Sequence, residues 1–144
     1  MIRFLLDINV LIALIDPAHV QHDRAHRWFA GRGRKAWATC PLTENGVLRI
    51  VGHPRYPNSP SSPAAVAELL ARFRKLPGHA FWPDDVSLLD PEHVNAGRLL
   101  DSAHVTDTYL LALARAHNGQ LASFDQRLVT DAVMDGRRSL HLIV

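Results

Sequence analysis

Apolar residues follow two alternating patterns along this chain. Short, mainly apolar runs predict strands over residues 2–6, 36–39, 80–82, 121–124 and 140–144, and the continuous run Phe4–Leu6 is typical of a strand buried on both faces. Between these runs, apolar positions recur at helical spacing and predict helices over residues 8–15, 19–30, 42–51, 63–76, 90–100, 108–117 and 126–134. Strands that alternate with helices predict an α/β fold with a parallel sheet covered on both faces.

Breaker residues set several of these boundaries. Asp16-Pro17 ends the first helix, whereas Ser62-Pro63 and Asp90-Pro91 each place a capping residue before a proline suited to the first helical position. Residues 53–63 hold prolines at 54, 57, 60 and 63, which exclude both a helix and a central strand. We therefore expect a long, exposed and mobile loop there.

Four acids occupy related positions in this predicted order. Asp7 and Asp125 each follow an apolar strand, and Glu44 and Asp107 each lie in the first turn of a helix. In a parallel α/β sheet, strand ends and the following helix starts share one edge, which is where such sheets bind ligands. We therefore expect the four carboxylates to meet there. The alternative left open by spacing alone is that each acid only caps its helix.

A shared pocket of four carboxylates predicts a bound cation. Their mutual repulsion would raise some of their pKa values unless a divalent cation balances the charge. All-oxygen sites with few protein ligands suit Mg²⁺ or Mn²⁺. Such ions activate water and stabilise the transition state of phosphodiester hydrolysis.

The charge of the chain favours a polyanionic partner. The formal net charge is +2 and the isoelectric point is near 9.1. A basic stretch contains five cations and only Asp23 as an acid: Arg24, Arg27, Arg32, Arg34 and Lys35. This pattern fits nucleic-acid binding, although a solvated helix face would look the same.

Composition limits the remaining possibilities. A chain of 144 residues, 47% hydrophobic and 21% charged, is typical of one globular domain. The single cysteine, Cys40, excludes an intramolecular disulfide and lies in an apolar run, so we expect it to be buried. No apolar run approaches the roughly 18 residues of a membrane span, and no secretory signal is visible, so we expect a cytoplasmic protein without membrane contact.

Four motifs resemble those of a known family. They are residues Leu5–Leu11, Thr39–Arg49, Val105–Ala114 and Ser123–Asp125, which contain the four acids in order. In order and spacing they are similar to the acidic motifs of the PIN-domain ribonucleases, and within that family to the VapC-type toxins of bacterial toxin–antitoxin pairs. The resemblance covers essentially the whole chain.

The resemblance implies a fold and an activity. It implies a single PIN domain over residues 1–144, a three-layer α/β/α sandwich with a mostly parallel sheet of about five strands. It also implies an endoribonuclease dependent on Mg²⁺ or Mn²⁺, a homodimer, and a cognate VapB-type antitoxin that occupies the active site. The implied catalytic and metal-binding residues are Asp7, Glu44, Asp107 and Asp125.

Two neighbouring residues are implied to support the site, and two positions depart from the family pattern. Asn9 would hold the Asp7 loop through side-chain hydrogen bonds, and Thr106 would support Asp107. Ile8 stands where many PIN domains carry Thr or Ser, so any hydroxyl contact to a ligand is lost there. Ser123 replaces a Thr that often stands two residues before the fourth acid.

Other polar residues offer contacts to RNA. Arg49 follows Glu44 by five residues and His104 precedes Asp107 by three, so either is a candidate phosphate contact. Tyr56, in the proline-rich loop, is the best candidate for stacking on a base. His19, His22 and His26 share a helix face, where a solvated surface is favoured over a zinc site.

Two further functions compete with a ribonuclease. One is a non-catalytic module that binds RNA or protein and keeps its acids for structure. The other is a phosphohydrolase with Asp7 as nucleophile, but that chemistry usually needs a second acid two residues later, where this chain has Asn9. Dependence on a divalent metal would separate the first alternative from an endoribonuclease.

Overall fold

A five-stranded sheet forms the centre of the molecule. The computed structural model describes residues 1–144, and its strands are β1 (Phe4–Leu6), β2 (Trp37–Thr39), β3 (His79–Phe81), β4 (Gln120–Ser123) and β5 (Leu140–Leu142). Their order is β3-β2-β1-β4-β5, and every neighbouring pair is parallel. The first strand therefore lies at the centre, and the chain adds strands first on one side of it and then on the other.

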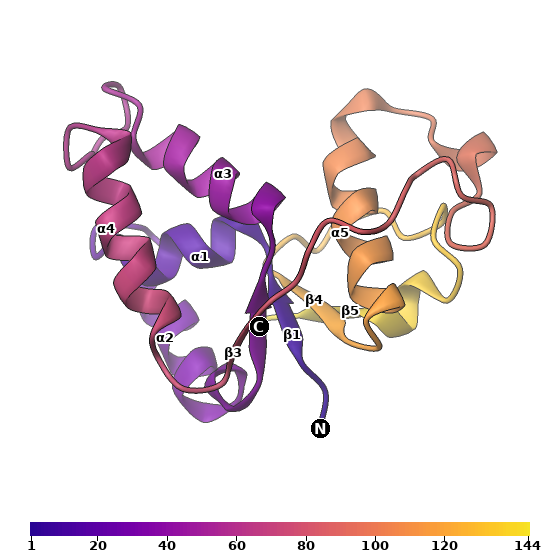
Figure 1. The fold of residues 1–144 in the computed structure, drawn as a ribbon, viewed down its shortest axis with the longest axis horizontal. Coiled ribbons are helices and arrows are strands. Elements are labelled where there is room, and N and C mark those ends of the chain that lie inside the picture. Colours follow the sequence, from indigo (N-terminus) through magenta and orange to yellow (C-terminus); the bar gives the residue numbers. More distant parts are fainter.

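Helices cover both faces of this sheet (Figure 1). One face carries α1 (Ile8–Ile15), α2 (His22–Gly31), α3 (Pro41–Val51) and α4 (Pro63–Arg74), and the other carries α5 (Val105–Ala116). Short 3-10 turns complete the chain: η1 (Gly33–Lys35), η2 (Ala96–Arg98), η3 (Ser102–His104) and η4 (Gly136–Ser139). The predicted three-layer α/β/α arrangement is confirmed. None of the helices combines the length and hydropathy needed to cross a membrane.

Two hydrophobic cores lie on the two faces. Phe4 and Leu6 of β1 point into the core formed with α1 to α4, whereas Leu5 points into the core formed with α5. This alternation explains why β1 is apolar at every position, because both of its faces are covered. Cys40 is fully buried in the α5-side core, as expected from its apolar surroundings.

Two predicted helices are wrong. Residues 90–100 form turns and the short η2, and residues 126–134 form turns without a helix. These segments pair with each other instead, through a β-bridge between Val94 and Val133. The amide of Asn95 donates to the carbonyl of Ala132 at 2.8 Å. Both valines are buried, so burial across the two segments outweighs the local helical pattern.

Two histidines stabilise the end of α1. The Nδ1 of His22 lies 2.6 Å from the carbonyl oxygen of Ala13, and the Nε2 of His26 lies 2.8 Å from that of Leu14. Because carbonyl oxygens only accept, both rings donate, and they satisfy carbonyls that the end of a helix leaves free. His22 is thus half-buried and His26 remains on the exposed surface, as the sequence suggests, and each makes a capping contact to α1.

Asp16 fixes the proline-rich loop to the end of α1. Its buried carboxylate accepts hydrogen bonds from the hydroxyl of Tyr56, from Asn58 Nδ2 at 2.7 Å and from the amide of Ala18 at 2.9 Å. Burial alone would raise the pKa of Asp16, but these hydrogen bonds lower it below its usual value. The loop lacks helix and strand as predicted, yet it is tethered at Tyr56 and Asn58 rather than free.

We predict that Tyr56→Phe lowers the free energy of unfolding by about 2 kcal/mol. The substitution keeps the ring but leaves a buried carboxylate short of one donor, and hydrogen bonds to charged groups are worth about that much. Urea denaturation measures the change, and limited proteolysis should cut residues 57–61 faster. Ser102→Ala, at an exposed serine whose side chain makes no hydrogen bond, is the control. Equal stability of the Tyr56→Phe and parent proteins would contradict this role of Asp16.

Candidate active site

The topology of the sheet brings the acids to one edge. Asp7 directly follows β1, and Asp125 follows β4. These two strands are parallel neighbours, and the strand order changes direction between them. Crevices at such switch points, outside the carboxyl ends of the strands, are the usual ligand sites of open α/β sheets. Glu44 and Asp107 lie in the first turns of α3 and α5.

One hydroxyl group links the first and fourth acids. Asp7 is only 7% exposed, and its Oδ2 accepts a hydrogen bond from Ser123 Oγ at 2.8 Å. The same Ser123 oxygen accepts a hydrogen bond from the amide of Asp125 at 3.1 Å. The other oxygen of Asp7 accepts from the amide of Ile8 at 2.8 Å, so Asp7 also caps α1. Asp7 therefore caps α1 and is also linked through Ser123 to Asp125.

The three aspartates share an electrostatic environment. Burial raises the pKa of Asp7, and hydrogen bonds from Ser123 and Ile8 only partly oppose this effect. Burial, together with the negative charges of Asp7 and Asp125, raises the pKa of Asp107 to about 6. The carboxyl group of Asp107 is thus held close to two other acids at a cost in charge repulsion.

Glu44 belongs to a different part of this edge. Its Oε2 accepts a hydrogen bond from Thr39 Oγ1 at 2.7 Å, and its carboxylate forms an ion pair with Arg74 of α4, with Nη1 at 3.2 Å from Oε2. Both partners belong to the β2–β3 side of the sheet. The fourth predicted acid therefore lies on the β2 side of this edge, and its charge is balanced by Arg74.

The four acids do not form a closed ligand set. No three of them have carboxylate oxygens within 4.8 Å of one another; the trio with that spacing is Asp90, Glu92 and His93. That trio belongs to a local turn in which Asp90 accepts from the amide of Glu92 at 2.9 Å. The turn lies in the chain segment that was wrongly predicted as a helix, away from the strand ends.

The predicted supporting residues lie in several places. Asn9 is exposed and its side chain makes no hydrogen bond, so Ser123 braces Asp7 in its place. Thr106 is exposed beside Asp107, and His104 is half-buried, with a charge that favours the ionised form of Asp107. Arg49 is exposed and unpaired.

Tyr56 lies far from the carboxylates. Its hydroxyl contacts Asp16, beyond the C-terminal end of α1, whereas Asp7 precedes the N-terminal end. The eight residues of α1 separate these ends by about 12 Å. A stacking role for Tyr56 close to the acids is therefore not supported by its position.

Ile8, the departure from the family pattern, has a packing role. A β-carbon placed on Gly46 of α3 would lie 2.5 Å from Ile8 Cδ1. The isoleucine side chain thus fills the space that this glycine leaves open, and α1 packs closely against α3. The residue after Asp7 contacts the protein interior.

Sequence reasoning missed three residues that this arrangement uses. Thr39 could have been found from the sequence, because a polar residue at the end of an apolar strand weakly indicates a functional position. Arg74 and His79 gave none, because each gains its role only from a partner distant in the sequence.

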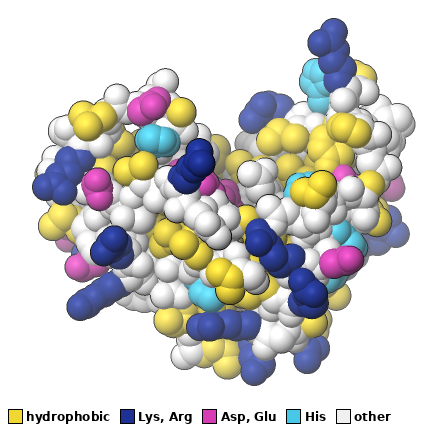
Figure 2. Space-filling model, turned by 180° about the vertical axis from the view of Figure 1, so that it is seen from behind, with side chains coloured by type: hydrophobic (Ala, Val, Ile, Leu, Met, Phe, Trp, Pro, Cys, Tyr) yellow, Lys and Arg dark blue, Asp and Glu magenta, His cyan; other side chains and the backbone are white.

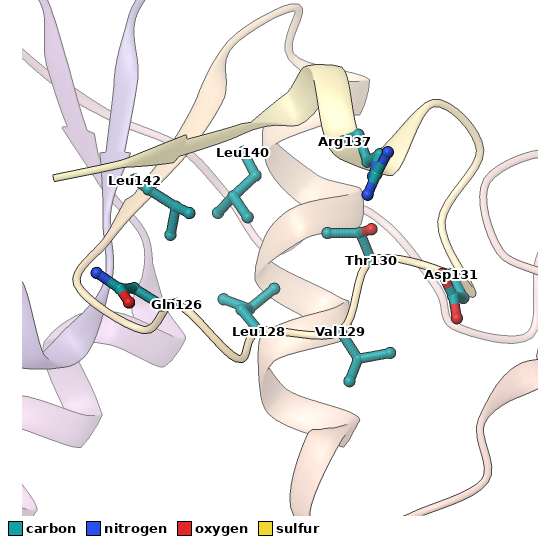
Figure 3. Close-up of a pocket in the computed structure, with 8 residues that line it drawn as sticks. All are labelled: Gln126, Leu128, Val129, Thr130, Asp131, Arg137, Leu140 and Leu142. Atoms are coloured by element: carbon teal, nitrogen blue, oxygen red, sulfur yellow. The ribbon is translucent and has the colours of Figure 1, made fainter. Parts of the chain in front are cut away.

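The surface of the molecule is notched between its two helical lobes. Figure 2 shows this notch from behind, with acidic side chains at its base and Lys or Arg side chains on both sides. A separate hollow of about 520 Å³ lies beyond Asp125, between residues 126–131 and β5 (Figure 3). Leu128, Leu140 and Leu142 point into that hollow, which has no cluster of acids and therefore does not resemble a metal site.

Known proteins are similar to this chain in sequence. The model of the PIN domain family matches residues 4–131. Ribonuclease VapC44 of Mycobacterium tuberculosis strain H37Rv is 46% identical over 140 residues, 97% of each chain. Ribonuclease VapC39 of the same strain is 41% identical over 128 residues, 89% of this chain and 92% of the relative.

A solved structure gives the same picture of the fold. VapBC2 from Rickettsia felis, bound to a DNA fragment from their promoter, matches with a TM-score of 0.58 and 11% identity over 98% of each chain. At this identity the match concerns the fold alone. The matched family model and the close relatives go further: this chain belongs to the PIN-domain family and, within it, to the VapC ribonucleases.

Proposed function

We propose that this protein is an endoribonuclease that hydrolyses phosphodiester bonds in RNA with Mg²⁺ or Mn²⁺, as the toxin of a toxin–antitoxin pair. The observation that carries the proposal is the convergence of Asp7, Asp107 and Asp125 at the switch point of the sheet, where burial and the charges of the other two acids raise the pKa of Asp107 to about 6. Membership of the VapC ribonucleases supports the reaction class.

The donor set fits a hard divalent cation. The carboxylates of buried Asp7, half-buried Asp107 and exposed Asp125 carry negative charge that no Lys or Arg pairs with, since the ion pairs of the structure involve other acids. An open set of carboxylate oxygens suits Mg²⁺, which keeps several of its waters. Asp7, Asp107 and Asp125 would hold the ion, with Glu44 alongside. When bound, it would supply an activated water and charge stabilisation for the phosphoryl group.

The protein's own residues prepare this site. Ser123 and the amide of Ile8 fix the two oxygens of Asp7, so its carboxylate enters the site already oriented. Thr106, in the first turn of α5, and His104, at the N-cap of α5, flank Asp107, and the charge of His104 acts on Asp107. A basic surface around the notch would attract the RNA backbone.

Partners follow from the family. We propose a VapB-type antitoxin as the cognate inhibitor and a homodimer as the assembly, in the cytoplasm. The solved VapBC2 structure supports the first of these, because it shows that proteins of this fold associate with a VapB partner. The RNA itself is not named by any contact in the structure.

We predict that Asp107→Asn lowers the rate of RNA cleavage at least a hundredfold, since metal-assisted charge stabilisation is worth several kcal/mol. The fold should persist, because the substitution relieves repulsion. Cleavage of a labelled RNA with Mn²⁺, beside a circular dichroism melt, gives the measurement. Asp23→Asn, at an exposed acid without a partner, serves as the matched control. RNA cleavage by the Asp107→Asn protein at the parent rate would contradict the assignment of the site. RNA left intact by the parent protein with either metal would favour a non-catalytic module.

The raised pKa of Asp107 is testable without RNA. The pKa of Asp107 is 3.8 in the unfolded chain and about 6 in the folded protein, so the folded state binds more protons between these values. Its contribution to stability therefore falls as the pH rises through this window. Solvent screening at a half-buried group reduces the effect to about 1 kcal/mol.

We accordingly predict that Asp107→Asn makes the metal-free protein about 1 kcal/mol more stable near pH 7.5 and gives no gain near pH 4. Urea denaturation in the presence of a chelator measures both values. If parent and variant show the same dependence on pH, the three aspartates do not repel one another as described.

Metal affinity should depend on pH for the same reason. Carboxylates ligate only when deprotonated, so we predict that Mn²⁺ binding weakens as the pH falls below about 6. Titration calorimetry near pH 8 and near pH 5 makes the comparison. An unchanged affinity would argue against Asp107 as a ligand.

A further inference from the structure

Arg74 places a cation beside the carboxylates. It lies in the last turn of α4, with Nη1 at 3.3 Å and 3.2 Å from the two oxygens of Glu44. Its guanidinium carbon lies 5.1 Å from the centre of the Phe81 ring, at the end of β3. Two contacts of different kinds, an ion pair and a cation–π contact, therefore fix the guanidinium group.

Glu44 is held in turn by a buried chain of hydrogen bonds. Thr39 is fully buried, and its hydroxyl has one proton, which it must donate to the acceptor-only carboxylate of Glu44 at 2.7 Å. The Thr39 oxygen therefore accepts from Nε2 of His79, 2.7 Å away, and this assigns the ring proton to Nε2. The ring of His79 packs on Trp37, with centres 4.6 Å apart.

The hydrogen bonds that link His79, Thr39 and Glu44 are matched in one protonation state of His79. Burial, helped by the positive charges of Arg74 and Arg3, lowers the pKa of His79 to about 4. At neutral pH the ring is uncharged and carries a single proton, which the contact with Thr39 uses. The order His79, Thr39, Glu44, Arg74 thus runs from the sheet to the surface with each donor and acceptor matched.

Arg74 keeps donors free for a ligand. A guanidinium group has five N–H donors, and here only Nη1 has a partner, while the side chain is 39% exposed. An ion pair at this exposure contributes little to stability by itself. A guanidinium group with unused donors matches the geometry of a phosphate group.

The location suits an RNA strand that reaches the aspartates. Thr39 ends β2 and Phe81 ends β3, one and two strands from β1, after which Asp7 lies. Neighbouring strands lie about 4.8 Å apart, so the ends of β2 and β3 lie roughly 5 and 10 Å along the sheet edge from the end of β1. A phosphate near the scissile one would fall in this range.

We propose that Arg74 binds an RNA phosphate next to the scissile phosphodiester, and that the chain His79–Thr39–Glu44 positions Arg74 for it. The inference rests on the proposed ribonuclease function and gives Glu44 a positioning role toward the substrate. Arg74 would thus be a phosphate contact in addition to Arg49 and His104, which the sequence analysis named as candidates.

The test measures RNA binding apart from cleavage. In the Asp107→Asn background, a fluorescent single-stranded RNA that the parent protein cleaves is titrated at several salt concentrations. Arg74→Gln keeps a donor toward Glu44 but removes the charge. We expect it to weaken binding about 5- to 10-fold and to reduce the slope of log K against log salt by about 0.7, the value for one phosphate contact on a single strand.

Arg72→Gln is the matched control, because Arg72 is an exposed cation on the same helix without a partner. We expect its affinity and salt slope to equal those of the background. Equal affinity and slope for Arg74→Gln would overturn the phosphate contact. Equal losses in both variants would overturn it as well, because they would indicate a diffuse field of charge.

A second pair of variants tests the positioning chain. Thr39→Val removes both hydrogen bonds at nearly constant volume, and we expect a two- to threefold loss of RNA affinity that Thr39→Ser restores. Unchanged binding by Thr39→Val would overturn the positioning role while leaving the phosphate contact in place. If instead the parent protein leaves every RNA intact with Mg²⁺ and Mn²⁺, the proposed function fails, whatever the binding experiment gives.

Discussion

The hydrogen bond between Ser123 and Asp7 is the contact on which this site depends. A carboxylate that is 7% exposed is costly to bury without a donor, and Ser123 supplies that donor from the neighbouring strand. The contact exists only because β4 pairs directly with β1, so that residues 116 positions apart in sequence lie side by side. The parallel order of the sheet is thus a requirement of the site as well as of the core.

The edge of the sheet divides into two halves with different charge. Next to β1 and β4, Asp7, Asp107 and Asp125 repel one another, and no Lys or Arg forms an ion pair with them. Above β2 and β3, Glu44 is already neutralised by Arg74 and anchored through Thr39. One half is suited to bind a metal ion and the other to bind an anion, which together match the two needs of a metal-dependent nuclease acting on a charged polymer.

Much of the fold could be predicted because it depends on local patterns. The central strand β1 is an apolar run buried on both faces, and the four acids stand next to strand ends or helix starts that the local pattern indicates. The failures occur where distant partners decide the outcome. Val94 and Val133 pair across 39 positions and prevent two predicted helices, and Arg74 gains its role from Glu44, 30 positions away. Tyr56 looked free for stacking because nothing in its loop indicated that Asp16 would bind its hydroxyl.

The contact between Ile8 and Gly46 has a consequence for how such sites diverge. Each residue stands next to an acid in space or sequence: Ile8 follows Asp7, and Gly46 follows Glu44 by two positions. The large side chain is accommodated only because α3 has no side chain at position 46. The two positions are therefore coupled. A smaller hydroxyl residue at position 8 would leave room for alanine at position 46, whereas alanine at 46 beside Ile8 would force the side chain that directly follows Asp7 to move.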